Sequence, residues 1–506
     1  MRLWTLLVTL SSVLLPVLSA EARPANVVIL VGDDHQNDIY GAYGSSLART
    51  PVLDRMAADG IRFDHAYCNS PMCTPSRQSF LTGRYPHAVG VTMLRHALDE
   101  SAYTLAHRLR EAGYRTGAFG KMHFNSRLLH GFEVHRSPAA FHAFDRGQQQ
   151  RQLPEDLEVF PKWRPHVDPA RVWLNAMVLP VGRYDDEMPD TWYAEEAIAF
   201  MKAHRDEPFF VQVGFHQPHS PFQFPVEFRG LYDPRDMPVP LIGPEDVPQI
   251  PAQFAPLTYA DKQGIVASYY TAAAFLDLNV GRILDAIDAL QLRENTLVIY
   301  LGDNGYHLGH HGRFEKHTLY ERCVRVPLVM RWPGRIPART HTDALVEFVD
   351  IVPTVLDYLD VSFNRQAAVP RDLHGHSLRP LIEGTAEKVR DVVFSAYQQT
   401  QVAMARTATH KLIYQTGNDA ERDWIGYEPL LTSDGREVIL YDLVTDPEEY
   451  RNVADWPENR EVVKALMEAL VDWHQRVPPV GPPPPAELTG KDFLDWAIAP
   501  RNPPTR

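Results

Sequence analysis

The sequence predicts an α/β fold, with helices flanking a mixed central sheet, followed by a smaller α+β unit with an antiparallel sheet. Short, continuous apolar runs rich in β-branched residues are typical of strands buried on both faces. Helical patterns separate these runs along the chain. After about Gly384 the strand-like runs become short and follow one another across turns, which is typical of an antiparallel sheet. With 506 residues, 44% of them hydrophobic, the chain can bury a large core.

Four runs have the buried-strand pattern, and two longer segments between them have helical spacing. The helical segments are Thr104–Glu111 and about Asp261–Leu290. The strand-like runs are Val27–Val31, Tyr114–Phe119, Phe209–Phe215 and Thr296–Leu301. Because ligands in open α/β sheets bind outside the carboxyl ends of the strands, we expect the functional residues directly after these runs.

In the C-terminal part, the sequence predicts four short strands, a closing helix at Glu461–His474 and a proline-rich extended arm at Val477–Pro485. The strands are Val392–Tyr397, Val402–Arg406, Lys411–Tyr414 and Val438–Tyr441. These patterns divide the chain into a main domain over 23–384, an α+β subdomain over 385–476 and an arm over 477–506.

The N-terminus has the pattern of a secretory signal over residues 1–22. Arg2 precedes an apolar run from Leu3 to Leu18, and Ala20-Glu21-Ala22 resembles a cleavage site. A retained anchor is the alternative. No later run of 18 or more apolar residues occurs, so we expect no stable membrane span in the mature chain. The expected location is secreted or periplasmic.

Charge and cysteine content exclude two classes of protein. With 50 Lys and Arg against 64 Asp and Glu, the net charge of −14 argues against general electrostatic binding to nucleic acid. The three cysteines, Cys68, Cys73 and Cys323, cannot form a disulfide framework, although a Cys68–Cys323 bridge stays open.

Acidic and amide side chains follow two of the predicted strands. Asp33 and Asp34 come after the first, and Asp303 with Asn304 after the last. Such oxygen ligands suit Ca²⁺ or Mg²⁺ if the two strands are neighbours. The alternative is that these residues only form turns or helix caps.

The segment Cys73-Thr74-Pro75-Ser76-Arg77, followed by Leu81-Thr82-Gly83-Arg84, is the most specific motif. It resembles the signature of the sulfatase family, in which the cysteine is converted to formylglycine. Without this resemblance, Cys73 would be interpreted as a small buried hydrophobic residue. Similarity extends from about Asn26 to Asn452 and includes Gly32-Asp33-Asp34, Gly120-Lys121-Met122-His123, Pro218-His219, Gly302-Asp303-Asn304-Gly305, Gly309-His310-His311-Gly312, Lys316 and Tyr441-Asp442-Leu443 with Asp446-Pro447.

The resemblance implies an alkaline-phosphatase-like sheet, one bound Ca²⁺, formylglycine at position 73 and a formylglycine-generating maturation enzyme as a partner. The implied ligands of the cation are Asp33, Asp34, Asp303, Asn304 and the modified Cys73. Arg77 would hold the hydrated aldehyde, and Lys121 and Lys316 would bind sulfate oxygens. His123 would act as a base and His219 as the acid for the leaving alcohol, with His216 as the competing candidate. His307, His310 and His311 could line the pocket, but we expect a structural role for each of them.

The substrate class is open at this stage. Tyr67–Pro71, Gly120–Phe124 and His130–Glu133 resemble choline sulfatase, whereas Val213–Phe222 resembles iduronate sulfatase. The secretory signal favours a sulfated carbohydrate. The alternatives are a phosphonate monoester or phosphodiester hydrolase and a non-catalytic protein that binds sulfated polymers. The stretch from Pro138 to Pro189 matches no substrate pocket that we can assign.

Overall fold

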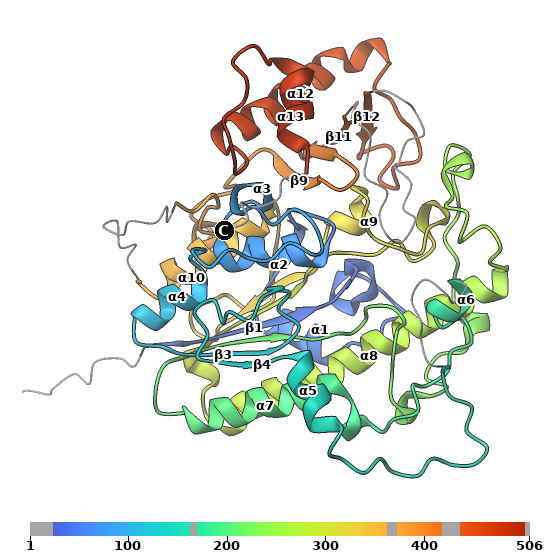
Figure 1. Ribbon diagram of the computed structural model, residues 1–506, viewed down its shortest axis with the longest axis vertical. Coiled ribbons are helices and arrows are strands. Elements are labelled where there is room, and N and C mark those ends of the chain that lie inside the picture. The colour runs from blue at the N-terminus through green and yellow to red at the C-terminus, as the bar shows by residue number, and fades with distance from the viewer. Residues whose placement is uncertain (1–23, 162–169, 362–371, 417–435, 501–506) are drawn as a thin grey trace, which may run out of the picture.

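The computed structural model describes residues 24–161, 170–361, 372–416 and 436–500 (Figure 1). The signal predicted over residues 1–22 lies outside these ranges. The described residues form an eight-stranded sheet in the order β4-β3-β5-β1-β6-β7-β2-β8 and a four-stranded sheet in the order β12-β11-β10-β9. Both the predicted α/β main part and the smaller C-terminal sheet are confirmed.

The large sheet is mixed. Its strands are β1 (Asn26–Gly32), β2 (Ile61–Tyr67), β3 (Arg115–Gly120), β4 (Val134–Arg136), β5 (Phe209–Gly214), β6 (Thr296–Gly302), β7 (Leu328–Arg331) and β8 (Thr340–Glu347). The run β4-β3-β5-β1-β6 is parallel throughout, whereas β7 is antiparallel to both β6 and β2. The carboxyl ends of β3, β5, β1 and β6 therefore lie side by side.

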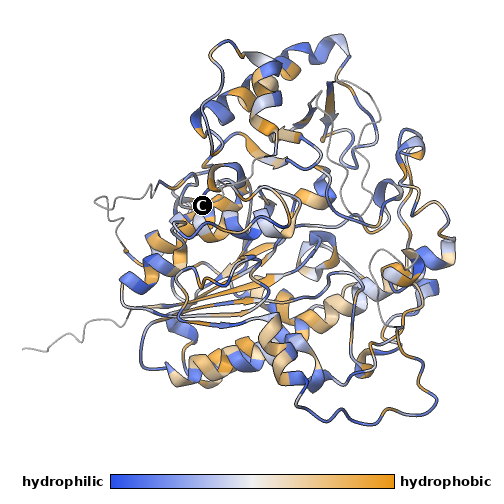
Figure 2. Ribbon diagram, viewed as in Figure 1, coloured by the Kyte–Doolittle hydropathy of each residue, from blue (hydrophilic) through white to orange (hydrophobic). Residues whose placement is uncertain are grey.

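Helices cover both faces of this sheet (Figure 1). The helices of this part are α1 (Pro51–Ala58), α2 (Cys73–Thr82), α3 (Pro86–Val89), α4 (Leu105–Glu111), α5 (Pro138–Asp145), α6 (Ala170–Trp173), α7 (Pro189–Ala203), α8 (Tyr259–Ala289), α9 (Glu321–Val324), α10 (Ile351–Tyr358) and α11 (Arg379–Ile382). One core joins the sheet to α1, α7 and α8, and the other joins it to α2, α4 and α10. The strands between them are strongly hydrophobic (Figure 2), which agrees with their burial on both faces.

The small sheet is antiparallel and consists of β9 (Val393–Tyr397), β10 (Val402–Arg406), β11 (His410–Gln415) and β12 (Glu437–Asp442). Helix α12 (Arg460–Arg476) packs on it and confirms the predicted closing helix. A further helix, α13 (Gly490–Ile498), was not predicted. Its buried residues Phe493, Leu494, Ala497 and Ile498 have helical spacing. It lies after the stretch Val477–Pro485 that was predicted to be extended, in which no helix or strand is assigned.

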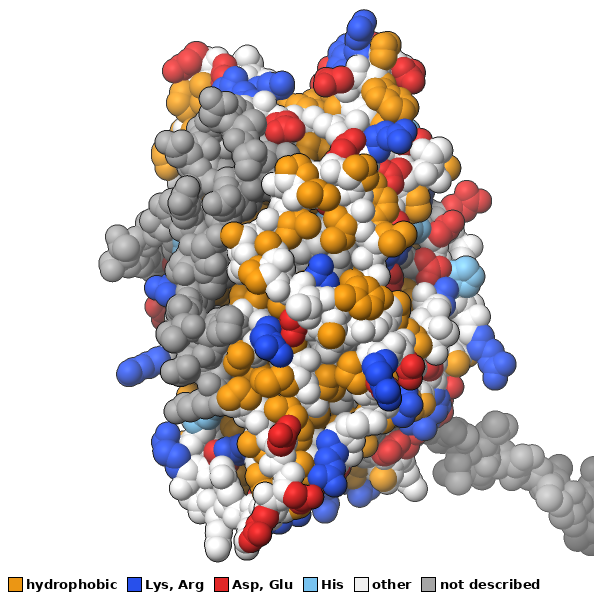
Figure 3. All heavy atoms as spheres, turned by 90° about the vertical axis from the view of Figure 1, so that its right-hand side faces the viewer, with side chains coloured by type: hydrophobic (Ala, Val, Ile, Leu, Met, Phe, Trp, Pro, Cys, Tyr) orange, Lys and Arg blue, Asp and Glu red, His pale blue; other side chains and the backbone are white. Residues whose placement is uncertain are grey.

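None of the helices in the described part of the chain is both long and apolar enough to cross a membrane. On the face shown in Figure 3, acidic and basic side chains are interspersed among hydrophobic ones. This face therefore carries no broad field of one sign. The three cysteines are buried free thiols, so the structure contains no Cys68–Cys323 bridge.

Candidate active site

The predicted site residues meet at the carboxyl edge of the large sheet. Asp33 and Asp34 follow β1, Lys121 follows β3, and Asp303 and Asn304 follow β6. His219 lies in the loop after β5, and Cys73 is the first residue of α2. The parallel order of β3, β5, β1 and β6 is the reason why residues far apart in sequence converge here.

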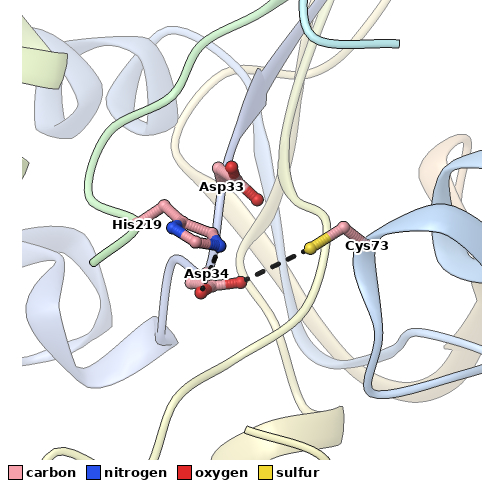
Figure 4. Close-up of side chains that lie close together, drawn as sticks. All are labelled: Asp33, Asp34, Cys73 and His219. Atoms are coloured by element: carbon pink, nitrogen blue, oxygen red, sulfur yellow. Dashed lines mark hydrogen bonds and ion pairs between the residues drawn. The ribbon is translucent and has the colours of Figure 1, made fainter. Parts of the chain in front are cut away.

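Four of these side chains form a group that could hold a metal ion. Asp33, Asp34, Cys73 and His219 each offer a ligand atom, and these atoms all lie within 4.8 Å of one another (Figure 4). The Cys73 Sγ is 3.9 Å from Asp34 Oδ1, and the His219 Nε2 is 3.6 Å from Asp34 Oδ2. Position 73 is thus beside the two aspartates, as the sequence predicted.

The other two predicted ligands differ in their contacts. Asp303 accepts hydrogen bonds from the Arg77 Nε at 2.7 Å and from the Asp34 backbone N–H at 3.0 Å, so both of its carboxylate oxygens have protein partners. Asn304 donates its Nδ2–H to Asp34 Oδ1 at 2.9 Å. The buried oxygens Asp33 Oδ1 and Asn304 Oδ1 have no hydrogen-bond partner among the described residues. Asp33 Oδ1 lies 3.5 Å from the Arg77 NH2 as an ion pair. Buried oxygens of Asp33 and Asn304 that accept no hydrogen bond, together with the carboxylate of Asp34, suit a hard divalent cation.

Two buried lysines flank Cys73. The Lys316 Nζ lies 2.7 Å from Cys73 Sγ and also donates to Asp34. The Lys121 Nζ lies 3.7 Å from the same sulfur and donates to Asp33. Burial, the largest single influence, would lower the pKa of Lys316, but the combined attraction of Asp34, Cys73, Asp33 and Asp303 outweighs it and raises the pKa well above its usual value. Lys316 therefore stays charged beside position 73, where it can bind an anion.

Arg77 is fully buried in α2 and links the strand ends. Besides its bond to Asp303, its NH1 donates to the Lys121 carbonyl at 2.5 Å. This contact requires glycine at position 214 of β5. A Cβ there would lie 2.7 Å from the Arg77 NH1 and 2.1 Å from the Lys121 carbonyl oxygen. The lack of a side chain at Gly214 thus leaves room for the Arg77 guanidinium and the Lys121 carbonyl at the ends of β3 and β5.

The unmodified thiol of Cys73 is a poor nucleophile at neutral pH. Burial raises its pKa to about 12, and the opposing influence of Lys121 and Lys316 does not offset this effect. Since the thiolate is the reactive form, the thiol itself would be almost entirely unreactive.

At Asp33, nearby positive charges have a larger combined effect on the pKa than burial has. Burial would raise its pKa, but Lys121, His219 and Arg77 hold it well below the usual value.

Both predicted histidines line the cavity in front of Cys73. The His219 Nδ1 donates to the Ser220 carbonyl at 2.6 Å, which directs its Nε2 toward Asp34. The His123 Nδ1 lies 3.1 Å from the Thr74 hydroxyl. Burial lowers the pKa of His219 to about 4 and that of His123 well below its usual value, so both rings are neutral at pH 7.

The remaining histidine candidates separate into two sets. His216 lines the same cavity but is outside the group of candidate metal ligands. His307, His310 and His311 are not among the described residues that line it. His307 instead contacts the Thr318 hydroxyl at 2.7 Å, and His311 contacts Asp246 at 2.8 Å. His317, which the sequence did not single out, lines the cavity and stacks on Tyr397 of β9 at 5.4 Å.

Asp34 has a left-handed backbone, with a φ of 60°. The hydroxyl of Tyr269, a buried residue of α8, donates to the Asp34 carbonyl and accepts from the Gln36 N–H at 3.0 Å. The Asp34 N–H is held by Asp303. Left-handed backbone is costly for a residue other than glycine. These contacts therefore hold the turn that directs the Asp34 carboxylate toward Cys73.

The cavity has a volume of about 1220 Å³. Its lining also includes Phe141 of α5 and Trp173 of α6, which belong to the stretch from Pro138 to Pro189. The sequence assigned no substrate pocket to this stretch, because single aromatic residues in it look like ordinary core residues.

Comparisons with known proteins give a consistent result. The family model described as sulfatase matches residues 25–361, and one described as N-sulphoglucosamine sulphohydrolase, C-terminal, matches residues 309–476. An arylsulfatase of Clostridium perfringens is 28% identical, with 88% of this chain and 93% of the relative covered. Iduronate 2-sulfatase of Homo sapiens is 27% identical, covering 87% and 82%. Among solved structures, a phosphonate monoester hydrolase of Agrobacterium radiobacter has a similar fold, with a TM-score of 0.74, 22% identity and coverage of 90% and 96%.

Proposed function

Since the chain belongs to the sulfatase family, we propose that it is an exported sulfuric ester hydrolase that cleaves a sulfate ester of a carbohydrate, using formylglycine made from Cys73 and a bound Ca²⁺. The observation that carries this proposal is the position of Cys73, whose sulfur lies within reach of Asp34, Lys121 and Lys316 in one cavity. These groups are the ones that the transfer of an SO₃ group requires.

The residues present fit both absent groups. A divalent cation would be held by Asp33, Asp34, Asp303, Asn304 and the modified side chain at position 73, and would supply positive charge to the sulfate. Asp303 also holds Arg77 and the turn at Asp34. The hydrated aldehyde at position 73 would supply one oxygen to attack sulfur and a second whose deprotonation releases sulfate.

The chain's own residues would bind the sulfate and move protons. Lys121 and Lys316 flank position 73 and would bind the non-bridging oxygens, whose charge grows in the transition state. Because His219 is neutral in the free site, it would have to gain a proton on Nε2 when the sulfate ester binds, and it would then give this proton to the ester oxygen as the S–O bond breaks. His123 would remove the proton from the second hydroxyl group at position 73, the one whose deprotonation releases sulfate. Water then completes the balance, because one water is consumed for each alcohol and sulfate released.

A phosphonate monoester hydrolase is the second candidate, because a solved structure of this kind shares the fold over 90% of the chain. Sulfate and phosphonate esters are similar in size and geometry. Rates with paired aryl sulfate and aryl phosphonate esters distinguish the two. A higher kcat/KM for the phosphonate would replace our proposal with the second candidate.

The non-catalytic alternative is tested by the mass of the peptide that contains Cys73. Expression beside a formylglycine-generating enzyme should convert the thiol to an aldehyde and give hydrolysis of 4-nitrophenyl sulfate. An unconverted thiol, together with binding of sulfated polymers but no hydrolysis, would support a binding protein instead.

A further inference from the structure

Two residues of the motif segment, Thr74 and Gln78, have no role in the mechanism above. Both are fully buried in α2, the helix that begins with Cys73. They lie on the same side of this helix, because residues four apart are neighbours on a helix surface. The Thr74 hydroxyl contacts the ring of His123, and the Gln78 amide contacts its backbone. The helix that presents the nucleophile therefore also holds the proposed base.

Gln78 fixes the backbone of the segment that carries His123. Its Nε2 donates to the Met122 carbonyl at 3.1 Å and to the His123 carbonyl at 2.9 Å. The preceding residue of the helix, Arg77, donates to the Lys121 carbonyl. His123 has a left-handed backbone, with a φ of 55°, which is costly for a residue other than glycine. The bonds to three successive carbonyls offset this cost and hold the His123 ring beside α2.

Thr74 determines which nitrogen of the His123 ring carries the proton. The Thr74 hydroxyl oxygen lies 2.8 Å from the Leu94 carbonyl oxygen and 3.1 Å from His123 Nδ1. A carbonyl oxygen can only accept, so the single hydroxyl proton is donated to Leu94. Toward His123 the hydroxyl can then only accept, and Nδ1 must be the donor. Because a neutral imidazole has one N–H group, Nε2 is left with a lone pair.

The Nε2 atom of His123 is available to the reacting groups. No residue in the described part of the chain makes a hydrogen bond with it. The half-buried ring lines the cavity in front of Cys73. Burial, followed by the positive charges of Lys121 and Arg77, holds the pKa of the ring well below its usual value, so the ring enters the reaction neutral. One ring nitrogen is thus bound to Thr74, and the other can accept a proton.

We propose that Thr74 is a positioning residue that keeps the proton of His123 on Nδ1, so that Nε2 can act as the base that releases sulfate from position 73. This inference rests on the proposed function and deepens it, because the motif specifies no residue type at position 74. In the opposite tautomer, Nε2 would carry the proton and could not accept another from the hydroxyl at position 73.

The proposal assigns the Thr74 hydroxyl to one step of the reaction. A proton passes from the second hydroxyl group at position 73 to His123 Nε2. The electron pair of that O–H bond forms the carbonyl group as the C–O bond to sulfate breaks, and sulfate leaves with the pair of the broken bond. Cleavage of the ester comes earlier and does not use His123. Loss of the Thr74 hydroxyl should therefore slow the release of sulfate and spare ester cleavage.

The tautomer is tested directly by nitrogen NMR on protein with isotope-labelled histidines and an unconverted Cys73, so that no activity is needed. His123→Gln identifies the signals of His123 by their loss. We expect a protonated Nδ1 and an unprotonated Nε2 in the wild type. Thr74→Val, which removes the hydroxyl with little change in volume, should lose this preference. A protonated Nε2 in the wild type overturns the proposal, whatever the enzyme hydrolyses.

The step is tested by the kinetics of the matured, Ca²⁺-loaded enzyme with 4-nitrophenyl sulfate. Thr74→Val should lower kcat at least about tenfold and lower KM in proportion. The ratio kcat/KM, which reports only the steps up to ester cleavage, should stay near the wild-type value. Rapid mixing should show a burst of one 4-nitrophenol per formylglycine, counted from the mass of the Cys73 peptide, before slow turnover. A lower kcat/KM without a burst would indicate a general disturbance of the site and overturn the proposal.

Two variants serve as controls. Thr74→Ser keeps the hydroxyl and should restore both the wild-type kinetics and the Nδ1 tautomer. Thr82→Val removes a hydroxyl of the same helix that donates to the Gln78 carbonyl at 2.6 Å, and it should behave as the wild type does. A Thr74→Ser variant that is as slow as Thr74→Val would contradict a role of the hydroxyl.

The Thr74 variants should fold, because the Leu94 carbonyl keeps a second donor, the Asn125 Nδ2 at 2.7 Å. If Thr74→Val does not fold, Thr74→Ala removes the same hydroxyl without adding a methyl group. A wild-type kcat in the folded variant overturns the inference and leaves the proposed function intact. A matured wild-type enzyme that hydrolyses no sulfate ester overturns both.

Discussion

Two parts of the cavity lining are built differently. At the Cys73 end, buried charged groups come from the ends of β1, β3 and β6 and from α2, and each has several partners. Elsewhere in the lining, the aromatic residues Phe141 and Trp173 come from α5 and α6, in the long segment between β4 and α7. The comparison indicates that the ends of the sheet strands position the charged groups, whereas this segment contributes apolar lining.

The largest expected effect is that of Cys73→Ala. Without the side chain that becomes the nucleophile, kcat/KM for any sulfate ester should fall by about 10³-fold or more. The matched control is Cys68→Ala, which removes another buried thiol and should leave the activity per folded molecule largely unchanged. Retention of more than about a tenth of the activity by folded Cys73→Ala would contradict the proposed chemistry.

Removal of the cation should impair the reaction of the sulfate group, because the proposed cation site lies beside Cys73. Chelation should lower kcat by about 10²-fold or more and lower the melting temperature, because a ligand that binds only the native state stabilises it. Adding Ca²⁺ back should restore both measurements, with Mg²⁺ as the comparison. Full activity and an unchanged melting temperature after exhaustive chelation would argue against a cation in this site.

His219→Asn and His216→Asn separate the two candidates for the acid. Loss of the acid should lower kcat for an alkyl sulfate by about 10²-fold or more, but should have much less effect on 4-nitrophenyl sulfate, whose leaving group needs no proton. His216→Asn should lower both rates to a similar, smaller extent. The reverse pattern would transfer the role to His216.

The smallest expected effect is that of Tyr269→Phe, which removes only the hydroxyl that contacts the Asp34 carbonyl and the Gln36 N–H. Loosening the turn at Asp34 should weaken Ca²⁺ binding about tenfold, measured by calorimetry or by the Ca²⁺ dependence of the melting temperature. Tyr270→Phe, on the next residue of α8, is the control. Equal Ca²⁺ affinities of the two variants would mean that Tyr269 does not position the ligand.

Much of the fold was predictable because the hydrophobic periodicity of its main elements is strong. The runs at Val27–Val31 and Thr296–Leu301 are continuous and apolar, and they become adjacent parallel strands. Strands β2 and β8 were not predicted, because the alternation in β2 includes Asp64 and His65 and the first half of β8 is polar. In both strands, pairing between distant segments decides the structure more than the local pattern does.

The site was predictable wherever a polar group follows a strong strand, as Asp33 and Asp303 do. Tyr269 and His317 were not predictable, since their roles depend on contacts between distant elements. The lining residues that come from α5 and α6 were missed for a related reason. Phe141 and Trp173 look like ordinary core residues in the sequence, and only the packing of the insertion shows that they line the cavity.

All ten residues of α2, from Cys73 to Thr82, are buried. An enzyme that oxidises Cys73 must bind the peptide around this residue, but in the folded protein that peptide has no exposed surface to bind. Under the proposed function, oxidation therefore has to precede folding, while the segment is still an extended chain. A molecule that folds too early would be stable and correctly shaped, but permanently inactive.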